Sequence, residues 1–169
     1  MSRWICAIDP GNEESAYVLL DPALRPVAGG KMANEQMYKE MWEKIIDLWP
    51  IRVEFAIEMI ASYGMPVGKE VFDTCVWIGR LQERLKGRPV RLIYRKDEKM
   101  MICKSMKAND ATIRQALVDR FAPGVSNHGK GTKKAPGWFY GFKADMWAAY
   151  AVGVTCHDMY FGGEDGTEG

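Results

Sequence analysis

The stretch WICAIDPGN, residues 4–12, decides how the chain begins to fold. Its first five residues form an apolar run that is typical of a buried strand, and the run ends at Asp9 in a turn that contains Pro and Gly. Two further strands are predicted over 16–20 and 26–32, at the short spacing of antiparallel neighbours. The sequence therefore opens with two or three antiparallel strands, and the first strand places a carboxylate at its end.

The rest of the chain alternates helices and strands. Apolar residues at helical spacing predict an amphipathic helix over 35–49. The pattern then predicts a strand over 53–58, a helix within 70–86, a strand over 89–94, a helix that Asn109 caps, a loop over 123–141 and a helix over about 142–159. This order indicates an α/β domain with a mixed sheet. We expect one domain over 1–161 and a disordered Gly- and Glu-rich tail over 162–169.

Length and composition exclude several classes of protein. The chain has 169 residues, of which 47% are hydrophobic and 27% charged, which argues against a disordered or fibrous protein. No apolar run is long enough to span a membrane, and no secretory signal segment opens the chain, so we expect a cytoplasmic protein with no membrane partner. The four cysteines are scattered, which argues against a disulfide framework and against a zinc ribbon.

The net charge of +1 hides a strong asymmetry along the chain. Residues 80–134 hold 15 Lys and Arg against 5 Asp and Glu, a net charge of +10, whereas the segments before and after them are acidic. A basic middle between acidic flanks suggests a polyanion as partner. The alternative is a charged surface that only meets solvent.

Three acids stand where an enzyme built on a sheet would place them. Asp9 ends the first strand, Glu58 ends the strand over 53–58, and Asp145 falls in the first turn of the last helix. A carboxylate among apolar neighbours needs a cation or hydrogen-bond donors beside it, and Mg²⁺ prefers such oxygen ligands. The alternative is that each acid only forms a turn or caps a helix.

Several segments together resemble RuvC-type Holliday junction resolvases. The opening CAIDPG at 6–11 with SAY at 15–17 resembles the first motif of that family, and AIE at 56–58 resembles the second. The segments GTKK at 131–134, PG at 136–137, YG at 140–141 and DMWAAYAV at 145–152 resemble the C-terminal motif of phage-type members. The resemblance covers about residues 4–158 and implies an RNase H-like fold, with a mixed five-stranded sheet flanked by helices. It also implies that the protein works in the cytoplasm of a bacterial or phage-infected host cell.

The resemblance implies that Asp9, Glu58 and Asp145 are both catalytic residues and ligands of Mg²⁺ or Mn²⁺, with two ions in each active site. Asp9 would be the ligand that bridges the ions. Members of the family often carry a further acid or His one turn earlier on the last helix. The matching position here is Phe142, which cannot bind a metal. This departure leaves the register of the match, or the second metal site, open.

The resemblance also assigns DNA contacts to the basic middle of the chain. The DNA-binding candidates, which would neutralise phosphates, are Arg80, Arg84, Arg95, Lys96, Lys104, Lys107, Arg114, Lys130, Lys133 and Lys134. Tyr63 follows the second motif and is the candidate for an apolar side chain that opens the junction, with Met65 and Phe72 as lesser candidates. Paired cuts need two active sites, so the resemblance implies a homodimer, formed through the helix at 70–86.

The function implied by the resemblance is a metal-dependent crossover junction endodeoxyribonuclease, which resolves four-way DNA junctions by hydrolysis of phosphodiesters. Two rival functions are a nuclease for other branched DNA, and a junction-binding module without catalysis whose metal site is incomplete at Phe142. A third rival, an actin-like nucleotide-binding fragment, conflicts with the short chain and with the lack of a second phosphate loop.

Overall fold

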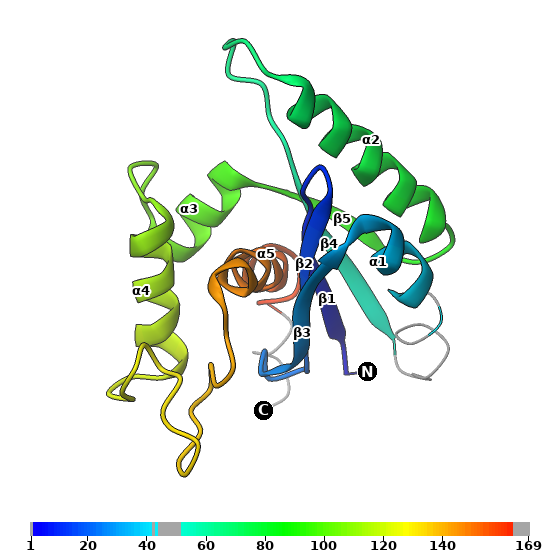
Figure 1. The fold of residues 1–169 in the computed structure, drawn as a ribbon. Coiled ribbons are helices and arrows are strands. Elements are labelled where there is room, and N and C mark those ends of the chain that lie inside the picture. Colours follow the sequence, from blue (N-terminus) through cyan, green and yellow to red (C-terminus); the bar gives the residue numbers. More distant parts are fainter. Residues whose placement is uncertain (1, 42, 44–51, 164–169) are drawn as a thin grey trace.

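The computed structural model describes residues 2–41, 43 and 52–163 (Figure 1). One five-stranded sheet in the order β3-β2-β1-β4-β5 forms its centre. The strands are β1 (Trp4–Asp9), β2 (Glu14–Leu20), β3 (Pro26–Ala33), β4 (Val53–Met59) and β5 (Val90–Tyr94). The helices are α1 (Asn34–Glu40), α2 (Lys69–Arg84), α3 (Arg95–Cys103), α4 (Asp110–Phe121) and α5 (Ala144–Tyr160).

The directions of the strands bring two carboxylates to one edge of the sheet. β1 pairs antiparallel with β2, and β2 pairs antiparallel with β3. β1 pairs parallel with β4, and β4 pairs parallel with β5, so the carboxyl ends of these three strands lie at the same edge. Ile8 stands opposite Ile57 in the register, which makes Asp9 and Glu58 neighbours across the two strands. The mixed sheet predicted from the sequence is confirmed.

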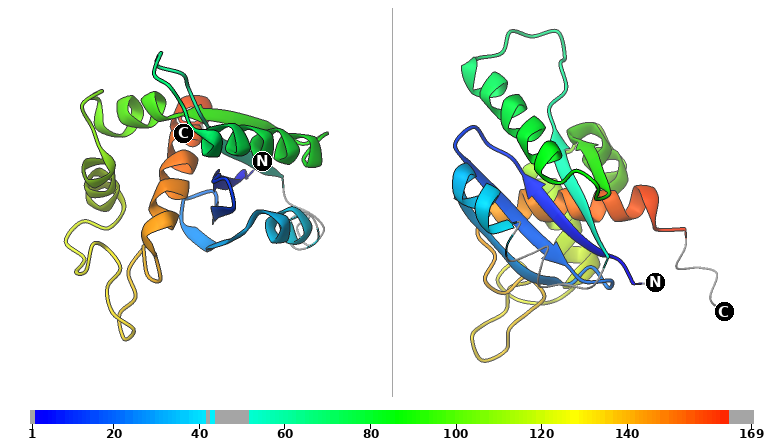
Figure 2. Two further views of the ribbon diagram at one scale, coloured as in Figure 1. Left: turned by 45° about the horizontal axis from the view of Figure 1, so that its top comes forward. Right: turned by 90° about the vertical axis from the view of Figure 1, so that its right-hand side faces the viewer.

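Both faces of the sheet are covered by helices. α1 and α2 cover one face, and α3, α4 and α5 lie on the other (Figures 1 and 2). Successive side chains of a strand point to opposite faces, so Ile5 and Ala7 of β1 join the core under α5, while Cys6 and Ile8 join the core under α2. This is why β1 reads as an unbroken apolar run.

α5 is the most deeply buried helix and lies directly against the strands. Its central residues are all buried, and it contacts β1 and β2 more than any other element. At Gly153 a Cβ atom would lie 2.6 Å from the Leu20 side chain and 3.0 Å from the Ala7 side chain, so only glycine allows this close approach. The close packing fixes where the first turn of α5, and with it Asp145, meets the sheet edge.

Some expectations from the sequence differ from the structure or fall outside it. α3 was not predicted, because its nine residues are mostly polar and show no clear apolar stripe. The expected last helix begins at Ala144 instead of 142. The helix expected over 35–49 is described only in its first part, and residues 164–169 of the tail lie outside the described residues. Residues 123–141 form the expected loop, tied by one bridge between Gly131 and Pro136.

Within the described residues, every helix is too short or too polar to cross a membrane.

Candidate active site

Asp9 and Glu58 form a pair of carboxyl groups at the ends of β1 and β4. The two side chains are hydrogen-bonded to each other. Burial, together with the charges of Glu98 and Asp9, raises the pKa of Glu58 to about 9, so the pair keeps a proton at neutral pH. Burial also raises the pKa of Asp9, and the nearby charge of Asp145 acts in the same direction. A cation that binds these two acids would displace the proton that they share.

Asp145 lies in the first turn of α5, on the far side of the same edge. Its carboxylate accepts a hydrogen bond of 3.0 Å from the Lys31 ammonium of β3. Lys31 also lies 3.6 Å from Glu14 of β2. The Asp145 side chain is half exposed, so this ion pair is open to solvent and contributes little to stability. Asp145 can therefore leave Lys31 at low cost.

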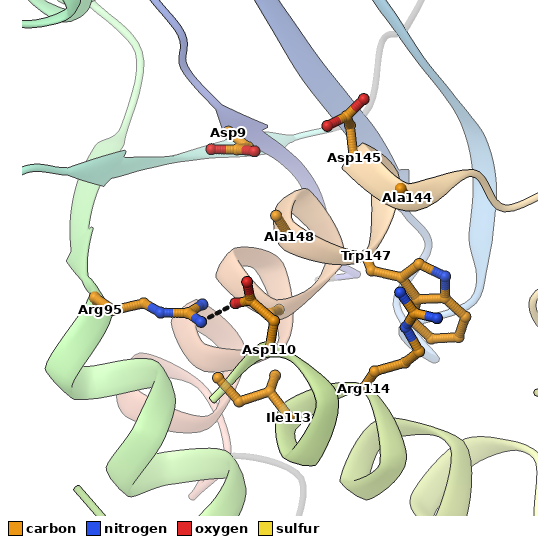
Figure 3. A pocket seen from close by; sticks show the side chains of 10 residues that line it. Asp9, Arg95, Asp110, Ile113, Arg114, Ala144, Asp145, Trp147 and Ala148 are labelled. Atoms are coloured by element: carbon orange, nitrogen blue, oxygen red, sulfur yellow. Dashed lines mark hydrogen bonds and ion pairs between the residues drawn. The ribbon is translucent and has the colours of Figure 1, made fainter. Parts of the chain in front are cut away.

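A cavity of about 340 Å³ opens beside these acids. Asp9 and Asp145 form one part of its wall, and the arginines Arg95 and Arg114 form another (Figure 3). The Arg114 guanidinium lies 5.4 Å from the centre of the Trp147 ring, which holds it at the cavity. A second cavity of about 320 Å³ also touches Asp9 and Asp145 and extends over the turn between β1 and β2. Carboxylates and guanidinium groups thus face a common space, which suits an anionic ligand together with a cation.

Two charged residues of α3 act on the site: Arg95, one of the basic candidates from the sequence, lines the cavity, whereas Glu98 was not singled out from the sequence. Glu98 is completely buried, and the Arg95 guanidinium donates a hydrogen bond of 2.8 Å to one of its oxygens. Arg95 also pairs with Asp110 at the start of α4. The only sequence signal was the charged run RKDEK at 95–99, which reads equally well as a solvated surface.

The donors around the cavity fit a hard divalent cation in their chemistry, because carboxylate oxygens are the ligands that Mg²⁺ and Mn²⁺ prefer. Over the residues that the structure describes, no three His, Cys, Asp or Glu side chains already form a metal-binding group. The contacts explain this, since Asp9 and Glu58 turn toward each other and Asp145 turns toward Lys31. The three acids lie near one another, but their side chains would have to turn toward a bound cation.

Phe142 does not lie on the last helix. This corrects the expectation from the sequence, which placed Phe142 on that helix, one turn before Asp145. α5 begins at Ala144, and Phe142 precedes it with only 4% of its surface exposed. Its ring packs 5.2 Å from Phe139 and 5.0 Å from Trp147, between ring centres. Phe142 therefore belongs to the aromatic core, and an acid at this position would be buried instead of presented to the cavity.

The basic candidates divide between two regions of the molecule. Arg114 lines the cavity, and Lys104 and Lys107 are exposed between α3 and α4. Lys133 and Lys134 are exposed and Lys130 is half-buried in the loop that leads to α5.

Arg80 and Arg84 lie apart from the acids. Both guanidinium groups lie 5.1 Å from the centre of the Tyr38 ring, and Arg80 also donates a hydrogen bond of 2.6 Å to Glu35 of α1. These two arginines help to hold α1 against α2, on the other face of the sheet. The structure does not bring them together with the three acids.

The segment between β4 and α2 carries exposed apolar side chains. Tyr63 and Met65 are 68% and 74% exposed at its tip, directly after the strand that ends near Glu58. Phe72 and Val76 are also exposed, on the first turns of α2, whereas Trp77 and Leu81 of the same helix are buried. The helix thus has an apolar inner face and a second apolar patch that meets solvent.

No protein-family model and no curated protein matches the sequence. Among solved structures, the chain is similar to Thermus thermophilus RuvC, with a TM-score of 0.67 and 16% identity over 95% of this chain and 96% of that one. It is also similar to T. thermophilus RuvC in complex with a Holliday junction substrate, with a TM-score of 0.65 and 14% identity over 97% of each chain. At this level of identity the likeness establishes a shared RuvC-like, RNase H-like fold over nearly the whole chain.

Proposed function

We propose that this chain is a metal-dependent DNA endonuclease that cuts four-way junctions. The observation that carries the proposal is the meeting of Asp9, Glu58 and Asp145 at one sheet edge, on a fold shared with a protein solved on a Holliday junction substrate. The arginines at the adjoining cavity support it, because a nuclease must hold a phosphodiester next to its acids. Phosphodiester hydrolysis is the reaction class that such a set of charges serves best.

Asp9, Glu58 and Asp145 would hold Mg²⁺ or Mn²⁺, with two ions per site. When bound, such ions activate a water molecule and stabilise the leaving oxygen in phosphodiester cleavage. The protein's own part is to gather the acids: Glu58 gives up the proton that it shares with Asp9, and Asp145 leaves Lys31. The proposed site thus exchanges a proton and an ammonium group for divalent cations.

The DNA would lie along the basic surface next to the cavity. Arg114 would contact a phosphate near the acids, and the exposed lysines would contact the flanking backbone, namely Lys104, Lys107, Lys130, Lys133 and Lys134. Arg80 and Arg84 would contact only an arm of the DNA that passes over α2. Tyr63 would enter the centre of the branched substrate, because an exposed apolar side chain can separate stacked bases.

A homodimer formed through α2 would supply the second active site. The exposed side chains of Phe72 and Val76 support this surface, since apolar groups on solvent-facing turns of a helix favour association. The likeness of the segment 131–152 to phage-type resolvases is the reason to propose a phage or prophage member.

The test is to incubate the protein with Mg²⁺ and a labelled four-way junction, beside a linear duplex and a flap of the same sequence. We expect paired cuts in the junction only. Asp9→Asn should abolish cutting while junction binding persists. The matched control is Asp119→Asn, an exposed aspartate on α4 whose loss should leave cutting unchanged.

Two outcomes would lead to other functions. Cutting of the flap in preference to the junction would favour a nuclease for other branched DNA. Tight junction binding without cutting in Mg²⁺ or Mn²⁺ would favour a junction-binding module, which the engagement of Asp145 by Lys31 already makes the second candidate.

A further inference from the structure

Glu98 is the only residue of α3 that is fully buried. Its exposed fraction is 0%, while every other residue of the helix is half-buried or exposed. Removal of a carboxylate from water costs several kcal/mol unless partners compensate for it. An apolar side chain would fill such a position more favourably, so packing alone does not account for an acid here.

The partners of Glu98 compensate for only one of its two oxygens. Arg95 donates a hydrogen bond of 2.8 Å to Oε2 of Glu98. Arg95 also pairs with Asp110 of α4 (Figure 3). Oε1 is shielded from solvent and has no hydrogen-bond partner among the residues that the structure describes. One oxygen is thus fixed by a cation of the protein, and the other is left without a donor.

The surroundings of Glu98 are the other acids of the site. α3 follows β5 without a linker, at the sheet edge where β4 ends, and Glu58 stands opposite Ile93 in the register. The charge of Glu98 is, after burial, the largest influence that raises the pKa of Glu58, and the charge of Asp9 acts in turn on Glu98. Arg95, which fixes Glu98, lines the same cavity as Asp9 and Asp145.

A purely structural role leaves this placement unexplained. If Glu98 served only to hold Arg95, the exposed Asp110 would already provide a carboxylate for that arginine. A third buried acid beside Asp9 and Glu58 adds repulsion, which a divalent cation would reverse.

We propose that Glu98 is a fourth acid of the centre, whose free Oε1 helps to bind the divalent cation, either directly or through a water molecule on that cation. The proposal rests on the proposed metal-dependent function and extends its ligand set from three acids to four. Arg95 acts as a positioning residue that holds Glu98 through Oε2.

The test is calorimetric titration of the full chain with Mn²⁺ in the absence of DNA. Glu98→Gln should raise the Kd for Mn²⁺ about tenfold or more, because loss of a group that supports a bound metal typically costs about 10- to 100-fold in metal affinity. The matched control is Glu54→Gln. Glu54 is also buried, is also held by an arginine through one oxygen, and also has an unpartnered oxygen among the described residues, but it lies at the opposite end of β4. Its variant should keep the Kd within roughly twofold.

Equal Mn²⁺ affinity in Glu98→Gln and wild type would overturn the proposal. A merely structural role would instead lower the melting temperature in EDTA and leave the Kd unchanged. Should Glu98→Gln fail to fold, Glu98→Asp keeps the charge on a shorter side chain and should still weaken Mn²⁺ binding; wild-type affinity in that variant would refute the proposal.

Failure of the fourth-acid proposal can be distinguished from failure of the proposed nuclease function. If wild type cuts junctions and the Glu98 variants bind Mn²⁺ as tightly as wild type does, the fourth acid is wrong and the nuclease stands. If Mn²⁺ binding depends on Glu98 but no DNA is cut, the nuclease is wrong and the fourth acid stands. If wild type binds no Mn²⁺, the fourth acid is refuted together with the metal site.

Discussion

Replacement of Glu58 by Gln should make the metal-free protein more stable at neutral pH. Burial and the neighbouring acids raise the pKa of Glu58 from 4.5 to about 9 in the folded protein. Above pH 4.5 the unfolded chain releases this proton and the folded protein keeps it, so the stability of wild type falls as pH rises from about 4.5 to about 9. Gln resembles the protonated acid in shape and never releases a proton, so it removes this cost.

The size of the effect follows from the same shift. At pH 7 the solvent lies about 2.5 pH units above the pKa of Glu58 in the unfolded chain, and each unit is worth about 1.4 kcal/mol, which sets an upper bound of about 3 to 4 kcal/mol. Partial contact of the carboxyl with solvent reduces this to about 2 kcal/mol. For a domain of this size, the variant should therefore melt about 4–8 °C higher at pH 7.

The assay is thermal unfolding of wild type and Glu58→Gln in EDTA between pH 4.5 and 8. The two proteins should have nearly equal melting temperatures at the acidic end and diverge as pH rises. Glu83→Gln, on the exposed face of α2, is the control and should follow wild type throughout. Parallel curves for wild type and Glu58→Gln, or a less stable variant at pH 7, would refute the reasoning. The same variant should lose Mn²⁺ binding. Glu58 would then lower the stability of the metal-free protein while being required to bind the metal.

Three other changes give expected outcomes from the structure. Phe142→Asp should lower the free energy of unfolding by at least about 3 kcal/mol and add no metal affinity, as measured by chemical denaturation and Mn²⁺ titration, because the ring lies in the aromatic core. Gly153→Ala should cost about 1–3 kcal/mol by chemical denaturation, since its methyl group would collide with Leu20 and Ala7. Lys31→Met should leave the melting temperature within about 2 °C of wild type and tighten Mn²⁺ binding, because it frees Asp145 from an exposed ion pair; weaker Mn²⁺ binding would show that Lys31 has a different role.

Strands were predictable because their signals are local. The apolar run before Asp9 and the apolar run before Glu58 each read as buried strands that end in an acid, and the structure places both acids at one edge. Their closeness could be expected once the two strands were taken as parallel neighbours. The last helix was predictable from its apolar residues, although its start was misplaced by two residues, which put Phe142 on the helix instead of in the core.

The residues that the sequence did not reveal are those whose role depends on partners far along the chain. α3 lacks an apolar stripe, so nothing in the charged run RKDEK at 95–99 distinguished the buried Glu98 from its exposed neighbours. Lys31 meets Asp145 across 114 positions of sequence. Arg80 and Arg84 belonged to the same basic segment as Arg114, yet their contacts with Tyr38 place them on the other face of the sheet.

The sequence by itself determined the alternation of strands and helices, the acids at the strand ends and the basic middle of the chain, because periodicity, turn residues and composition act over a few neighbouring positions. Only the tertiary structure decided which charges share one space. The parallel pairing of β1, β4 and β5 and the close approach of α5 at Gly153 bring Asp9, Glu58, Glu98 and Asp145 to a common edge. Burial at that edge, and not residue type, then raises the pKa of Asp9, Glu58 and Glu98.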